Sequence, residues 1–218
     1  MLRSAGYVPL DWLLIGLAAA LPLVTWLNQD ITLLLTIAVI ASLSWLLVRP
    51  TSDRSLVDWS LSLGMALYLG GFMLFYMPLR AFPSIVPGFW VIALLVLSWV
   101  CDSSAFFVGR AIGRTPLAPI ISPKKSVEGA IAGLIAPTLV GLLAGLLLHL
   151  NPLLAAGYGL VIAIGTIVGD LIESLVKRQT NVKDSGVLIP GHGGLLDRMD
   201  SLLLCAQLAV LYLRAFLT

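Results

Sequence analysis

The residues most able to do chemistry in this chain lie in one polar stretch, residues 174–200, SLVKRQTNVKDSGVLIPGHGGLLDRMD. This stretch holds four of the thirteen lysines and arginines, three of the eleven acids and one of the two histidines. Asp197 and Asp200 have i,i+3 spacing, which places two carboxylates on one face of a helix. With a third carboxylate from a neighbouring helix they would form the oxygen-rich site that Mg²⁺ prefers.

Further acids lie inside apolar segments, where an ionisable group is costly and indicates function. Asp102 lies in VLSWVCDSSAFFVG, and Asp170 and Glu173 lie in GTIVGDLIESLVKR. Helical spacing puts Asp170, Ser174 and Lys177 on one face. Two structural alternatives stay open: Asp170 is half of an ion pair that orders the helices, and Glu173 pairs with Lys177 at i,i+4.

Basic side chains and glycines from two loops accompany these acids. The basic groups are Lys124, Lys125, Lys177, Arg178, Lys183 and His192, and Gly191, Gly193 and Gly194 flank the histidine. Backbone N–H groups of glycines can approach a phosphate closely. A basic loop is also typical of a cytoplasmic membrane face that contacts anionic lipid. Acids, bases and glycines together indicate metal-assisted phosphoryl or nucleotidyl transfer at a membrane surface.

Membrane helices must position these groups. Hydrophobic residues make up 59% of the 218 residues, charged residues 11%, and the mean hydropathy is +1.03. We therefore predict an all-α, polytopic transmembrane bundle of about seven spans, each near the twenty residues needed to cross a bilayer. The predicted spans cover residues 10–27, 31–48, 56–76, 84–112, 127–150, 152–178 and 196–216. Cys101 and Cys205 lie inside apolar segments, so we expect no disulfide.

The distribution of positive charge predicts the orientation. Seven spans place eleven of the thirteen basic residues on the side of the N-terminus, and only Arg80 and Arg214 on the other. This puts the N-terminus and the loops 110–126 and 179–196 in the cytoplasm. We expect residues 1–83 to be a scaffold of about three spans and residues 84–218 to be catalytic. Asp58 lies near the start of the third predicted span, within this scaffold. We expect its side chain to snorkel from the helix end to water.

Two motifs resemble the signature of the phosphatidate cytidylyltransferases, or CDP-diacylglycerol synthases. The first is Ser174-x-x-Lys177-Arg178, Lys183-Asp184 and His192-Gly193-Gly194-x-x-Asp197-Arg198-x-Asp200. The second is Asp102-x-x-Ala105-Phe106-x-x-Gly109-Arg110 with Ser122-Pro123-Lys124-Lys125-Ser126-x-Glu128-Gly129. The resemblance covers about residues 85–218. Members of the family are usually longer, by one or two N-terminal spans.

The resemblance implies that CTP and phosphatidate give CDP-diacylglycerol and pyrophosphate with Mg²⁺. By the same resemblance, metal ligands are Asp170, Asp197 and Asp200, with Asp102 a weaker candidate. Catalytic residues are Asp170, Asp197, Lys177, Arg178 and Lys183, and substrate-binding residues are Lys124, Lys125, Ser174, His192, Gly193, Gly194 and Arg198. Glu128 and Asp184 would orient the basic side chains. A second cation and a homodimer stay open.

The implied setting is the inner (plasma) membrane, with a multi-pass chain whose active site faces the cytoplasm. CTP, phosphatidate and membrane lipids are the expected partners, and no nucleic acid is expected. One alternative is a related CTP-using lipid enzyme, such as a polyprenol kinase or an archaeol-type cytidylyltransferase. Two further hypotheses are a cation or proton transporter and a catalytically inactive remnant. A transporter should carry polar residues on both membrane faces, whereas here they gather on one.

Overall fold

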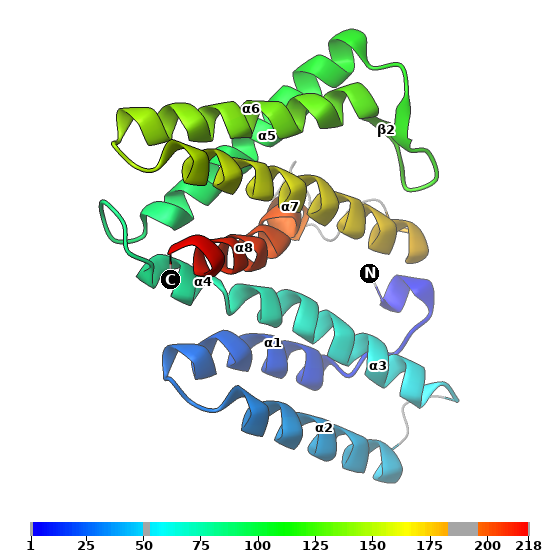
Figure 1. The fold of residues 1–218 in the computed structure, drawn as a ribbon. Coiled ribbons are helices and arrows are strands. Elements are labelled where there is room, and N and C mark those ends of the chain that lie inside the picture. Colours follow the sequence, from blue (N-terminus) through cyan, green and yellow to red (C-terminus); the bar gives the residue numbers. More distant parts are fainter. Residues whose placement is uncertain (1, 50–52, 183–195, 218) are drawn as a thin grey trace. The chain divides into compact units, whose positions relative to one another are not determined.

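The computed structural model describes residues 2–49, 53–182 and 196–217, with only the backbone for 196–200. Over these residues the chain forms helices and one short hairpin (Figure 1), which confirms the all-helical class. Two compact units are present, Met1–Met77 and Pro78–Thr218. The proposed functional division between residues 1–83 and 84–218 stays a prediction.

The first unit packs short helices around leucines. After a 3₁₀ turn, η1 (Arg3–Ala5), come α1 (Asp11–Trp26), α2 (Ile31–Val48), α3 (Ser55–Ala66) and the π-helical segment η2 (Leu67–Gly71). The buried core consists of Leu10, Leu13, Leu17, Leu21, Leu46 and Ala66. A Cβ on Gly70 would lie 2.6 Å from the Ala18 Cα, so only glycine lets η2 approach α1 this closely.

Within the described part of the chain, polar side chains cap three helix starts. Asp30 accepts a hydrogen bond from the Thr32 backbone N–H at 2.8 Å before α2, and this bond lowers the pKa of Asp30. The Ser126 hydroxyl accepts from the Gly129 N–H at 3.2 Å, and the Asn151 side chain accepts from the Leu153 N–H at 3.0 Å. Each cap satisfies a donor that the first helical turn leaves without an intrahelical acceptor.

Asp58 does not snorkel, so the prediction for this residue is wrong. Its side chain is 2% exposed and accepts a hydrogen bond from the Val8 backbone N–H at 3.0 Å. One turn later the Ser62 hydroxyl accepts from the Leu10 N–H at 2.8 Å. These α3 side chains therefore hold the segment that leads into α1, because its backbone donors need buried acceptors.

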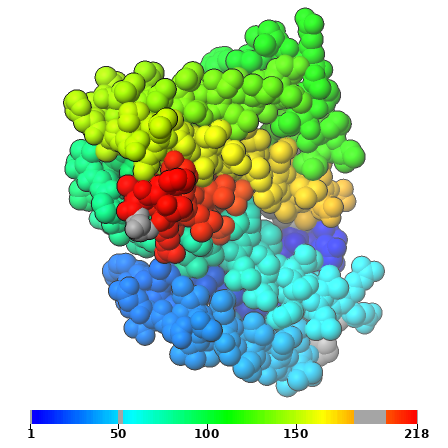
Figure 2. All heavy atoms as spheres, in the orientation of Figure 1, coloured from blue at the N-terminus to red at the C-terminus, as the bar shows by residue number. Residues whose placement is uncertain are grey.

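The described part of the second unit consists mainly of four long helices, with a short β-hairpin between the first two of them. Its elements are α5 (Phe89–Ile112), β1 (Pro116–Ala118), β2 (Ser122–Ser126), α6 (Val127–Leu147), α7 (Pro152–Gln179) and α8 (Leu196–Leu217). Helix α6 packs against both α5 and α7, and α7 packs against α8. In the space-filling view α6 (yellow-green) lies directly against α7 (yellow) (Figure 2). A Cβ on Gly129 would lie 2.7 Å from the Ala105 carbonyl oxygen, so α5 and α6 approach closely there.

Buried hydrogen bonds connect the helices of this unit. The Tyr158 hydroxyl donates to the Trp90 carbonyl at 2.7 Å, and the Thr166 hydroxyl donates to the Ser98 hydroxyl at 3.1 Å. Cys101 and Cys205 are both buried free thiols, as predicted. These bonds fix α7 against α5, because each buried polar group needs its partner away from water.

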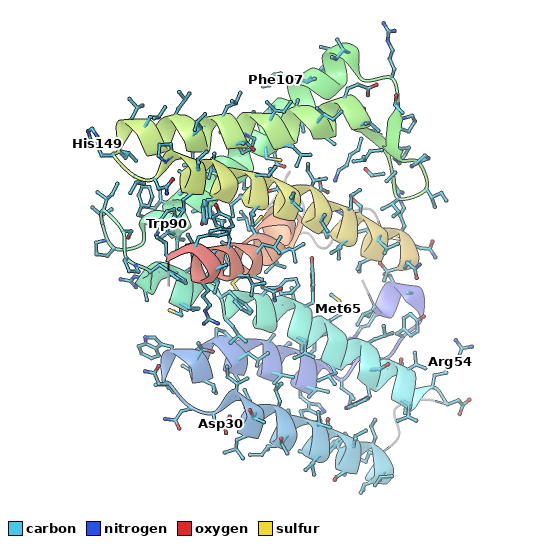
Figure 3. All side chains as sticks on the ribbon, viewed as in Figure 1. Asp30, Arg54, Met65, Trp90, Phe107 and His149 are labelled. Carbon is cyan, nitrogen blue, oxygen red and sulfur yellow. The ribbon has the colours of Figure 1, made fainter. Side chains whose placement is uncertain are left out.

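Among the described residues, five segments are long and apolar enough to cross a membrane: Ile31–Val48, Ser55–Ala81, Phe89–Ile112, Val127–Leu147 and Pro152–Gln179. The second of these continues from α3 through η2 into α4 (Tyr76–Ala81). The other two predicted spans contain the shorter apolar helices Asp11–Trp26 and Ser201–Leu217. Large apolar side chains such as Phe107, 67% exposed, stand out from the helices (Figure 3). Such exposure is typical of a surface that contacts lipid.

Candidate active site

The loop predicted over residues 110–126 contains an antiparallel hairpin. Helix α5 ends at Ile112, and β1 then pairs with β2 through Pro116 opposite Ser126 and Ala118 opposite Ser122. Strand β2 carries both lysines of the SPKKS motif. We name Pro116–Ser126 the basic hairpin.

The basic hairpin forms one wall of a cavity of about 620 Å³. The opposite walls come from α5, α6 and α7. Polar and charged residues lining the cavity are Asp102, Arg110, Ser122, Lys124, Lys125, Ser126 and Asp170, and apolar ones include Phe106 and Ile167. The structure therefore brings together four predicted site residues, two acids and two lysines, from segments far apart in the sequence.

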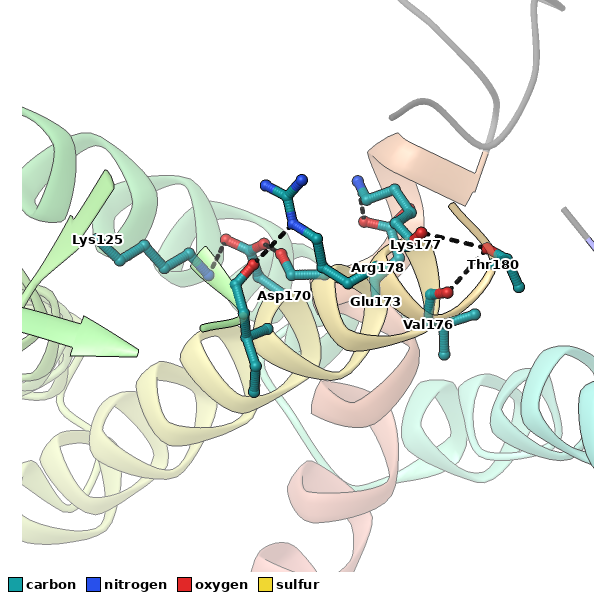
Figure 4. A network of polar contacts seen from close by, with 9 residues as sticks. Lys125, Asp170, Glu173, Val176, Lys177, Arg178 and Thr180 are labelled. Atoms are coloured by element: carbon teal, nitrogen blue, oxygen red, sulfur yellow. Dashed lines mark hydrogen bonds and ion pairs between the residues drawn. The ribbon is translucent and has the colours of Figure 1, made fainter. Parts of the chain in front are cut away.

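Asp170 is the centre of the contacts in this cavity (Figure 4). The Lys125 ammonium lies 2.5 Å from the Asp170 Oδ2, and the Ser174 hydroxyl is 3.5 Å from the Oδ1. Both partners of the ion pair are partly exposed, with side-chain exposures of 25% for Lys125 and 36% for Asp170. The carboxylate is thus open to the cavity and already faces a positive charge.

The end of α7 carries the next predicted residues. Lys177 pairs with Glu173 at 2.9 Å, as its i,i+4 spacing predicted, and the Glu173 side chain is 1% exposed. The Arg178 Nε donates to the Ile121 carbonyl at the tip of the basic hairpin, at 3.2 Å. Lys177 and Arg178 also line a second cavity of about 290 Å³. Two basic groups therefore lie beside the hairpin at the polar end of α7.

Several predicted site residues fall outside this description. Lys183, Asp184, His192, Gly193 and Gly194 lie outside the described residues. The backbone at Asp197, Arg198 and Asp200 is the first turn of α8, whereas their side chains are not described. The convergence of Asp197 and Asp200 on Asp170 stays a prediction.

The residues that are described fit a Mg²⁺ ion in the kind of donor they offer. Asp102 and Asp170 line one cavity and supply hard carboxylate oxygens. Among the described side chains, no three aspartate, glutamate, histidine or cysteine residues gather into a closed cage. Mg²⁺ commonly uses one or two carboxylates and takes its remaining ligands from water and substrate phosphate, so the open pair suits it.

The structure adds information on two motif residues, Glu128 and Arg110. Glu128 was expected to orient the lysines, and the contacts of its carboxylate are with the backbone: it accepts hydrogen bonds from the N–H groups of Arg114 and Thr115, at 3.2 Å each. Arg110, which the second motif contains, lines the cavity as well, although the sequence assigned it no role. Its position at the end of an apolar helix, two turns after Asp102, was the signal available in the sequence.

Comparison with known proteins places this geometry in context. The sequence profile described as the cytidylyltransferase family matches residues 1–216. A phosphatidate cytidylyltransferase of Mycobacterium bovis is 35% identical over 218 residues, covering 93% of this chain and 70% of that protein. The Pseudomonas aeruginosa phosphatidate cytidylyltransferase is 55% identical over 115 residues, covering 51% and 42% respectively.

A plant relative gives a similar match. Phosphatidate cytidylyltransferase 5, chloroplastic, of Arabidopsis thaliana is 40% identical over 145 residues, covering 62% of this chain and 36% of that protein. This chain therefore matches about two fifths of the length of the plant and Pseudomonas relatives, and more than two thirds of the mycobacterial one.

Proposed function

The chain belongs to the cytidylyltransferase family, and from this premise we propose that it transfers the cytidylyl group of CTP to phosphatidate. The products are CDP-diacylglycerol and pyrophosphate. The observation that carries the proposal is the cavity that Asp102 and Asp170 line together with the two lysines of the basic hairpin, one of which pairs with Asp170. The carboxylates can bind a cation and the lysine ammonium groups can bind phosphates. One cavity that holds both kinds of group suits a reaction between two phosphate-bearing substrates.

The reaction needs positioning more than proton transfer. An oxygen of the phosphatidate monoester attacks the α-phosphorus of CTP in line, and the bond from that phosphorus to the bridging oxygen of pyrophosphate breaks. The attacking oxygen is already anionic, so no general base has to activate it. The protein's work is to hold two anions together and to neutralise charge that moves to the leaving pyrophosphate.

The described side chains divide this work by location. Lys124 and Lys125 line the larger cavity and would bind the triphosphate, while Arg178 and Lys177, at the smaller cavity, would bind the lipid phosphate. Asp170, with Asp102, would hold Mg²⁺. When bound, Mg²⁺ supplies neutralisation of phosphate charge. Lys183, His192, Gly193, Gly194, Asp197, Arg198 and Asp200 would complete the site as the family resemblance implies.

One assay tests the proposed function. Purified protein in detergent is given phosphatidate, Mg²⁺ and each labelled nucleoside triphosphate in turn, and liponucleotide formation is measured. We expect labelled CDP-diacylglycerol with CTP, and none when Mg²⁺ is chelated. Polyprenyl phosphate and CDP formed from a polyprenol, or a liponucleotide formed from an archaeol-type lipid but not from phosphatidate, would favour the related lipid enzymes instead. No product with any lipid would contradict the proposal.

We also propose seven spans in the inner membrane, with the N-terminus and the basic hairpin in the cytoplasm. The one-sided distribution of basic residues supports this orientation. Ile120, at the hairpin tip, is 92% exposed, and His149, in the connection between α6 and α7, is exposed at the other end of α6. These two positions therefore report opposite faces of the membrane.

Cysteine labelling in membrane vesicles checks this orientation. A membrane-impermeant maleimide should label Ile120→Cys in inverted vesicles and His149→Cys in right-side-out vesicles. The native thiols Cys101 and Cys205 are buried, so the unsubstituted protein serves as the unlabelled control. Labelling of both positions from the same side would contradict the proposed topology.

A further inference from the structure

The basic hairpin is too short to fix its own conformation. Strand β1 has three residues and β2 has five, and an isolated two-stranded hairpin is at best marginally stable in water. The lysines that line the cavity are on β2, so their positions depend on what holds the hairpin to the helices. Contacts outside the hairpin must supply that stability.

Glu128 makes such contacts at the hairpin's base. Its two carboxylate oxygens accept from the Arg114 N–H at 3.2 Å, from the Thr115 N–H at 3.2 and 3.3 Å, and from the Thr115 hydroxyl at 3.0 Å. In return the Val127 N–H donates to the Thr115 carbonyl at 2.8 Å. The chain entering the hairpin is therefore bound to the first turn of α6, where the chain leaves it.

Glycine makes this arrangement possible. A Cβ on Gly113 would lie 2.6 Å from the Ser126 hydroxyl oxygen and 2.2 Å from the Gly109 carbonyl oxygen. The exit from α5 thus passes directly against the residue that caps α6. Because both ends of the hairpin meet here, one carboxylate can control both.

We propose that Glu128 is a positioning residue for CTP, acting through the basic hairpin on Lys125. The proposal rests on the proposed function. Glu128 lies three residues after Lys125, and its contacts tie the residues that precede β1 to the first turn of α6, which follows β2 directly. Lys125 in turn reaches Asp170 at 2.5 Å, so a shift of β2 would move the ammonium away from the carboxylate and from the triphosphate that both would contact. If Glu128 served only to stabilise the first turn of α6, its substitution would not change CTP binding through Lys125.

A double-mutant cycle separates these two roles. We expect Glu128→Ala to raise the Kd and the KM for CTP about tenfold when Lys125 is present, but less than about twofold in the Lys125→Met protein, because effects that act through one group are not additive. The KM for phosphatidate should change less than about twofold. Glu128→Gln keeps one acceptor oxygen and should recover about half of the loss on a logarithmic scale. Binding of labelled CTP measures the Kd without turnover.

Asn151→Ala is the matched control, because it removes the cap at the start of α7, far along that helix from Asp170 and Arg178. It should lower thermal stability and leave the CTP constants unchanged. If Glu128→Ala does not fold in detergent, Glu128→Gln and Thr115→Val enter the same cycle. Equal effects of a Glu128 substitution with and without Lys125 would overturn the positioning role alone. A wild-type protein that forms no liponucleotide would instead overturn the proposed function and this role with it.

Discussion

Asp170→Asn is expected to lower turnover by about a thousandfold or more while leaving the protein folded. Losing a carboxylate that would hold the cation between two phosphate substrates should cost roughly 4 kcal/mol of transition-state stabilisation, and each 1.4 kcal/mol is about tenfold in rate. The substitution also removes the negative charge opposite Lys125, 2.5 Å away. Liponucleotide formation at saturating CTP and phosphatidate, over a range of Mg²⁺ concentrations, measures the effect. Asp197→Asn is expected to behave in the same way.

Asp30→Asn provides the control for Asp170→Asn. Asp30 is an acid of the first unit that caps α2, and asparagine caps a helix about as well as aspartate. Its substitution should leave turnover unchanged. If Asp170→Asn keeps near-wild-type turnover at saturating Mg²⁺, the Lys125–Asp170 pair is an ion pair that orders the helices. That is the structural alternative that the sequence leaves open for Asp170.

The helices could be predicted because the forces that define them are local. Apolar runs set the length of each span, and proline and glycine mark the joints: the span predicted over 31–48 is α2, and the one over 152–178 is α7 with one residue added. The third predicted span instead contains a π-helical segment at Gly70, where tertiary packing against Ala18 decides the backbone. No periodicity in the sequence reports such an approach.

The site was predictable in its residue types but less so in its contacts. Asp170 and Lys125 are 45 positions apart, so their pairing depends on how α7 meets the hairpin. The hairpin could not be predicted, because SPKKS contains only serine, proline and lysine and shows no alternation of apolar and polar residues. The prediction that Asp58 snorkels was wrong for a related reason. A carboxylate near a helix end normally reaches water, and only the fold shows that Asp58 accepts a hydrogen bond from the Val8 N–H.

The two cavities predict that different substitutions affect different substrates. Lys124 lines the larger cavity with Asp170, whereas Arg178 lines the smaller one at the end of α7. Contacts that are equally strong in the bound and transition states appear in KM. We therefore expect Lys124→Met to raise the KM for CTP about tenfold and the KM for phosphatidate less than about threefold, and Arg178→Met to do the reverse, since a guanidinium suits a phosphate at headgroup level.

Arg178 also donates to the Ile121 carbonyl, which makes its substitution the more informative of the two. Loss of that bond loosens the hairpin tip, so Arg178→Met should have a smaller, second effect on CTP. Arg178→Lys keeps the charge but not the fork of donors, and should recover less than half of the loss. Arg80→Met, on the opposite side in the proposed topology, should change neither constant. Initial rates measured while both substrates are varied give the two KM values. Equal effects of Lys124→Met and Arg178→Met on both KM values would mean that the CTP triphosphate and the lipid phosphate share one pocket.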